Sequence, residues 1–204
     1  MTPGTGCNGA VALAGLGAHA WNPNTGHFLL TNGNATGNLT IGTVDEIDPK
    51  VGDTTCGGVS CGPVVINSFV MPNCMPTSIV QGPGKNFLVG CADHDGQAFP
   101  PNEYVIDGTS GAILANITNT GAVDEVWYNP GDNRYYTAGR DMSPPQMGVI
   151  DAGTNLWLTN FPVNTNAHSI AVDPNTNHVF MPQQAGAICG TQISNGCIDV
   201  IAEQ

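Results

Sequence analysis

A turn centred on proline, with an apolar stretch on either side, recurs four times along this chain. Each copy is followed by a further apolar strand, and in the first three copies this strand closes on Ile-Asp, as in Ile106-Asp107 and Ile150-Asp151. The turn prolines, spaced by 60, 47 and 44 residues, are Pro23, Pro83, Pro130 and Pro174. Periods of this size are typical of propeller blades, in which each unit is a small sheet that buries its faces against its neighbours. The repeat therefore predicts a stack of similar β-sheets.

The composition supports an all-β fold, because 27 Gly and 15 Pro among 204 residues, with many Asn, Asp and Thr, favour turns. We expect a single β-propeller over residues 1–204 with about four blades of four antiparallel strands. The expected blades span approximately 17–70, 74–118, 124–161 and 168–204. The last repeat provides only three of its four strands.

Two alternatives remain for completing the last blade. Residues 7–16 include an apolar run at 11–14 and could supply the missing strand, which would close a four-bladed ring. Alternatively, another chain completes the blade, and the four blades belong to a larger or multi-chain propeller. Open ends would leave strand edges without hydrogen-bonding partners, and such edges favour association into homo-oligomers.

The charged residues are few and strongly unbalanced: 16 are acidic and 4 are basic, for a formal net charge of −12. Nucleic acids and anionic membrane surfaces bind clustered Lys and Arg, so we expect neither as a partner. No apolar run is long enough to predict a membrane span. A protein, a small neutral ligand, a glycan or a cation fits this acidic chain better.

The seven cysteines favour disulfides, since they lack the CxxC and Cys/His spacings of zinc and haem sites. A hairpin that turns at Gly82-Pro83 places Cys74 opposite Cys91, within disulfide reach. Two further pairs flank short loops, and one cysteine is left unpaired or bonded between chains. These are Cys189–Cys197, Cys56–Cys61 and Cys7. Such local disulfides predict an extracytoplasmic location, namely secreted, cell-surface or periplasmic.

Candidate functional residues lie where the innermost strands begin, because equivalent positions of successive blades converge on the central channel. Alignment of the four prolines makes Gly17, Thr77, Asp124 and His168 equivalent. Thr77, Asp124 and His168 are therefore candidates for ligand binding at the channel. Asp124, Glu125 and His168 offer carboxylate and imidazole groups that could hold Ca²⁺ or Zn²⁺, or act as a general base with its orienting partner. Alternatively, these polar residues only bond the backbone of neighbouring blades.

A second candidate metal cluster is Asp93-His94-Asp95, in the loop after the second strand of its blade. The equivalent loops of the next two blades carry Arg140-Asp141 and Gln183-Gln184. Three consecutive residues rarely all point inward, so an Asx-turn with a solvated histidine is the alternative interpretation.

The segments 168–180 (HSIAVDPNTNHVF) and 148–151 (GVID) resemble the YVTN/YncE-type β-propeller repeat. The resemblance covers about residues 17–204 and is strongest in the last two repeats. It implies a propeller of a kind found mostly in extracytoplasmic binding or surface proteins. SMP-30/lactonase-like propellers are more distant relatives.

The chain contains no nucleophile elbow, phosphate-binding loop, dinucleotide fingerprint or HExxH motif. Our leading hypothesis is therefore an extracytoplasmic β-propeller that acts as a ligand- or protein-binding or assembly module. One alternative is a metal-dependent, lactonase-like hydrolase with a cation site at the central channel. The other is a structural subunit that polymerises through open propeller edges.

Overall fold

The structure is a computed structural model that describes residues 16–33, 41–52, 63–92, 101–190 and 195–202. These residues form strands and turns without a helix, so the described part of the chain contains no helix that could cross a membrane.

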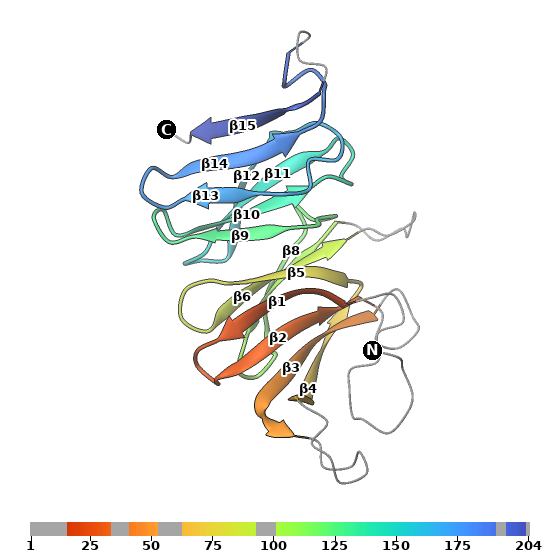
Figure 1. Cartoon of the computed structure of the whole chain (residues 1–204), viewed down its shortest axis with the longest axis vertical. Coiled ribbons are helices and arrows are strands. Elements are labelled where there is room, and N and C mark those ends of the chain that lie inside the picture. The colour runs from red at the N-terminus through yellow and green to blue at the C-terminus, as the bar shows by residue number, and fades with distance from the viewer. Residues whose placement is uncertain (1–15, 34–40, 53–62, 93–100, 191–194, 203–204) are drawn as a thin grey trace.

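The strands form four antiparallel sheets that follow one another along the chain (Figure 1). Within each sheet, strands that are consecutive in the sequence are neighbours. The first sheet contains β1 (Leu16–Asn22), β2 (His27–Asn32), β3 (Ile41–Gly52) and β4 (Pro63–Pro72). The second contains β5 (Met75–Gln81), β6 (Asn86–Ala92), β7 (Glu103–Asp107) and β8 (Ile113–Ile117). The third contains β9 (Val126–Asn129), β10 (Arg134–Gly139), β11 (Gln146–Asp151) and β12 (Leu156–Pro162). The fourth, with three strands in the described residues, contains β13 (Ala171–Asp173), β14 (His178–Gln183) and β15 (Cys197–Ala202).

Three of the Pro-centred turns are capped by the side chain of their first residue. The Oδ1 atoms of Asn22, Asn129 and Asp173 accept a hydrogen bond from the backbone N–H two residues later, at 3.1, 3.0 and 2.9 Å. The last residue of these three turns has a positive φ and is Gly26, Asn133 or Asn177. Glycine and asparagine adopt this left-handed backbone most readily, which explains their recurrence before the second strand.

The Asp of the Ile-Asp signature caps the turn between the third and fourth strands. Oδ1 of Asp107 accepts a bond from the N–H of Thr109 at 2.7 Å, and Oδ1 of Asp151 accepts one from the N–H of Gly153 at 2.9 Å. The hydroxyl of Thr109 also donates to Asp107, and the N–H of Thr154 donates to Asp151. These two bonds contribute most to the lowered pKa of the two aspartates, because they favour the ionised carboxylate. The sequence signature thus reflects a capped turn.

Successive sheets pack face to face, and an apolar cluster fills each of the three interfaces. Leu29, Val44 and Met71 of the first sheet pack with Phe87 and Ile106 of the second. Leu88 and Val105 of the second pack with Tyr135 and Ile150 of the third. Tyr136, Met147 and Val149 of the third pack with Val179 and Met181 of the fourth. The second and third sheets are therefore covered on both faces.

The first and fourth sheets lie at opposite ends of the elongated molecule (Figure 1). The described part of the chain therefore forms an open stack, and the closed four-bladed ring is not observed. Residues 7–16 are expected to complete the last blade, but Leu16 belongs to β1 of the first sheet. Residues 7–15 lie outside the described part, so their role stays a prediction.

The β5–β6 hairpin has a different register from the predicted one. A turn at Gly82-Pro83 would pair Gln81 with Gly84, but Gln81 is paired with Phe87. The loop is longer because Gly84, with a φ of +64°, extends it, and the N–H of Gly82 bonds the carbonyl of Asn86 at 2.8 Å. The predicted register is therefore wrong by three residues.

Two disulfides are present: Cys74–Cys91, with Cα atoms 5.1 Å apart, and Cys189–Cys197, with Cα atoms 5.5 Å apart. Cys91 is paired across the hairpin with Pro76, so its bond to Cys74 runs diagonally. The predicted bond Cys56–Cys61 and the fate of Cys7 lie outside the described residues.

Candidate functional site

The hydroxyl of Thr77 bridges the second and third sheets. Its Oγ1 donates a hydrogen bond to the carbonyl of Val123 at 2.8 Å, and the carbonyl of Gly90 lies 3.4 Å away. Thr77 thus bonds the backbone just before β9, which is the structural role considered as the alternative for these polar residues.

Asp124 and His168 lie side by side at the start of the third and fourth sheets. His168 Nδ1 is 3.7 Å from Asp124 Oδ2, and Arg140 Nη1 is 3.1 Å from the same oxygen. Arg140 also pairs through Nε with Oδ2 of Asp141 at 3.3 Å. These four side chains are each at least one-third exposed. Ion pairs in such an environment are weak, so Arg140 and His168 can exchange them for contacts to a ligand.

Glu125 faces the segment just before β13. Its Oε1 accepts a bond from the hydroxyl of Ser169 at 3.3 Å, and its Oε2 accepts one from the N–H of Ile170 at 3.4 Å. Ser169 Oγ also lies 3.2 Å from His168 Nδ1. Glu125 is therefore connected to His168 through Ser169 and joins the third sheet to the fourth.

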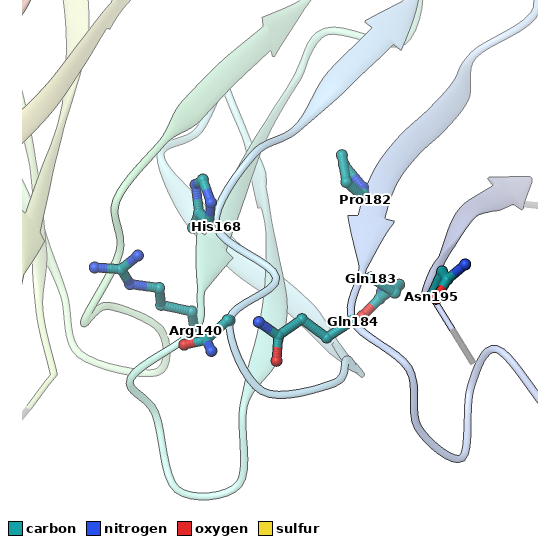
Figure 2. A pocket seen from close by; sticks show the side chains of 7 residues that line it. Arg140, His168, Pro182, Gln183, Gln184 and Asn195 are labelled. Carbon is teal, nitrogen blue, oxygen red and sulfur yellow. The ribbon is translucent and has the colours of Figure 1, made fainter. Parts of the chain in front are cut away.

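A hollow of about 410 Å³ opens beside this cluster. Arg140 and His168 lie on one side of it, and Gln184, Gln183 and Asn195 follow toward the other (Figure 2). Asn166 and Pro182 complete the lining. Gln183 is buried, and its Oε1 accepts a bond from the N–H of Asn164 at 2.8 Å, which fixes this wall.

The lining is polar, with four amide side chains, one guanidinium and one imidazole. Amides both donate and accept hydrogen bonds, so this surface suits a ligand rich in neutral hydrogen-bonding groups. In the described residues, no three His, Cys, Asp or Glu side chains are grouped closely enough to hold a metal ion. The expectation of a Ca²⁺ or Zn²⁺ site on Asp124, Glu125 and His168 stays a prediction.

Sequence reasoning missed Arg140, Gln183 and Gln184 as parts of a site, although it aligned the loops that carry them. These loops follow the second strand of the third and fourth sheets, and they were considered only as counterparts of Asp93-His94-Asp95. That cluster lies outside the described residues. The position of these loops in the repeat could have indicated the site, because loops that follow equivalent strands of neighbouring sheets lie at the same end of the stack.

Away from the hollow, the carboxyl group of Glu103 is completely buried between the second and third sheets. Burial raises its pKa to about 8, because the charged form loses its hydration there. Neither oxygen has hydrogen-bond geometry to a partner, but the hydroxyls of Thr120 and Thr137 lie close enough to moderate the increase in pKa. Glu103 is therefore largely a neutral acid at pH 7.

No family model matches the sequence, and comparison with curated protein sequences finds no match. Solved structures are similar in fold. The chain superposes on hydrazine synthase of Kuenenia stuttgartiensis with a TM-score of 0.59 at 13% identity, covering 90% of this chain and 45% of that one. A chain of the mitotic checkpoint complex superposes with a TM-score of 0.57 at 8% identity, and the match covers 92% of this chain and 51% of that one. The WD40 β-propeller domain of Doa1 superposes with a TM-score of 0.56 at 10% identity, and the match covers 84% of this chain and 48% of that one.

These similarities show the fold: the chain is an all-β propeller with about four blades. It spans about half the length of the chains that it matches. Together with the open stack, this agrees with an incomplete propeller.

Proposed function

We propose that the chain is an extracytoplasmic binding module that recognises a neutral, hydrogen-bonding ligand such as a glycan in the hollow between the third and fourth sheets. The observation that carries the proposal is the convergence of amide side chains with Arg140 and His168 around one hollow. The net charge of −12 disfavours anionic ligands, and the two disulfides support an oxidising compartment. In this proposal the four sheets act as one domain over residues 1–204.

A ligand in the hollow takes the place of exposed contacts that the lining side chains make with other residues. Gln184 is exposed at the middle of the lining, and only its backbone carbonyl is bonded by Asn164, at 2.9 Å. Its side-chain amide is thus available to a sugar hydroxyl. Arg140 supplies further donors once it releases Asp124.

The test is binding of a panel of neutral oligosaccharides, measured on a glycan array and then by calorimetry with the best probe. Gln184→Ala should weaken binding by about fivefold, since one hydrogen bond at a binding site contributes about 1 kcal/mol. The matched control is Asn116→Ala, which removes an exposed amide from β8 in the second sheet. Absence of binding to every probe, or equal binding by the Gln184→Ala variant, would contradict the proposal.

A further inference from the structure

Each end of the stack presents a sheet face without a neighbour in the described part of the chain. The outer face of the first sheet, which is turned away from the second sheet, exposes Leu16, Trp21, Phe28 and Val70. The outer face of the fourth sheet, which is turned away from the third, exposes Ala171, Pro182, Ile198, Val200 and Ala202. All of these side chains are apolar. Figure 1 places the two sheets at opposite ends of the molecule.

The repeat shows that the outer face of the first sheet has the chemistry of an interface. Phe28 is the second residue of the second strand in its sheet and is 36% exposed. The same position in the other three sheets is fully buried against the preceding sheet and is occupied by Phe87, Tyr135 and Val179. Phe28 is exposed because no sheet of the described residues packs on this face.

The outer face of the fourth sheet has the matching chemistry. Val200 is paired with Phe180, the third residue of the second strand, and is 50% exposed. In the three earlier sheets the position of Val200 is at most 3% exposed and is occupied by Glu46, Val105 and Val149. Val105 and Val149 pack against the following sheet, whereas the buried carboxylate of Glu46 bonds His27 and Asn67 of its own sheet. The two outer faces thus carry the positions that form the two sides of the internal interfaces.

We propose that a second copy of this chain packs the outer face of its first sheet on the outer face of the fourth sheet, so that the stack continues from one copy to the next. The contact is head to tail, because the two faces differ. It repeats the packing already present at the three internal interfaces. If the rotation closes after two copies, they form one ring; if it does not, the stack extends.

Three observations favour a second copy as the partner. The large exposed side chains of both faces are apolar, and His19 lies beside Phe28 on the first of them, so these residues add no negative charge to the contact. The chain spans about half of the propellers that it resembles, so two copies match one of them in length. Burial of large side chains such as Trp21, Phe28 and Ile198 supplies a driving force that hydrogen bonding along the β15 edge alone would lack.

The experiment measures molar mass by light scattering on the 204-residue chain with its disulfides intact, over about 1 to 100 μM, which detects association with a micromolar Kd. The expected result is a mass of two or more copies at the upper concentrations. Val200→Asp on the fourth sheet and Phe28→Asp on the first sheet should each give the mass of one copy. An equimolar mixture of these two variants should regain a two-copy species, because one face of each remains intact.

Leu114→Asp is the matched control, since Leu114 is 49% exposed on β8, away from both outer faces. It should associate like the unchanged chain. Ile198→Asp, at a residue that is 66% exposed, replaces Val200→Asp if circular dichroism shows that the latter is unfolded. A single-copy mass at all concentrations, or association retained by the Phe28→Asp variant alone, would overturn the proposal. The Gln184→Ala variant should associate normally, so this result is independent of ligand binding in the hollow.

Discussion

A carboxyl group that is buried away from water makes the stability of a protein depend on pH, and Glu103 is such a group. Its pKa is 4.5 in an unperturbed chain and about 8 in the folded protein. Between these values the folded state keeps a proton that the unfolded state releases. The free energy of unfolding therefore falls as pH rises through this window, by at most about 1.4 kcal/mol per pH unit for a single group.

Glu103→Gln should remove this dependence, because the amide has nearly the same shape and does not ionise. We expect the variant to unfold at a higher denaturant concentration than the unchanged chain near pH 8, and the difference should shrink toward pH 5. Urea unfolding across this range measures it. Glu125→Gln, which changes an exposed carboxylate, is the control. If the free energy of unfolding changed with pH in the same way for the unchanged chain and for Glu103→Gln, this carboxyl group would not be protonated in the folded protein.

Single residues of the site were only partly predictable from the sequence. The repeat alignment put Asp124 beside His168, because equivalent residues of neighbouring sheets converge, and their atoms are 3.7 Å apart. It gave no reason to expect Arg140 on the same carboxylate, since its loop follows a different strand. A pairing that depends on two loops folding toward each other leaves no pattern in one sequence.

At the scale of the element, the turns explain why the repeat is recognisable. Asn155 closes the turn from β11 to β12 with a φ of +58°, and its N–H bonds the carbonyl of Asp151 at 2.8 Å. Gly111 has the equivalent place in the second sheet, with a φ of +70°. Positions with positive φ select Asn and Gly, so these residues mark strand ends in the sequence.

Asn155→Val should destabilise the protein by about 1 to 2 kcal/mol, because a β-branched side chain is strained in the left-handed region. Asn155→Gly should change stability by less than about 0.5 kcal/mol, since glycine accepts this φ without strain. Chemical unfolding of both variants at one pH compares them. Equal stability of the valine and glycine variants would mean that the turn adopts another conformation.

The sheet of β9 to β12 spans residues 126–162, where the repeat predicted a blade over 124–161, because apolar runs are bounded by turn residues. The pairing between strands was harder to predict. The β5–β6 register was wrong because Gly82-Pro83-Gly84 allows more than one turn, and the sequence does not show which glycine takes the positive φ. The Cys74–Cys91 bond forms all the same, since a diagonal pair is also within reach.

At the scale of the whole molecule, the stack is a one-dimensional array in which each sheet contacts only its neighbours. Among the described residues, the second and third sheets gain packing energy from two interfaces, whereas the first and fourth gain it from one. In such arrays, stability is approximately the sum of each unit and its interfaces, so the end units open first. β11 is the third strand of its sheet, and its four central residues are buried. β15 is the third strand of the fourth sheet, and its residues alternate between intermediate and exposed.

Native-state hydrogen exchange should therefore show a gradient along the stack. In the non-associating Val200→Asp variant, we expect backbone amides of β15 to exchange at least about tenfold faster than those of β11, because β15 opens locally and β11 only with the core. In the unchanged chain, exchange in β1, β2 and β15 should slow as protein concentration rises, since association would cover both outer faces, while exchange in β11 should stay constant. Mass spectrometry of peptic fragments measures both effects. Equal protection of β11 and β15 in the variant would mean that the fourth sheet is stabilised by something other than its single interface.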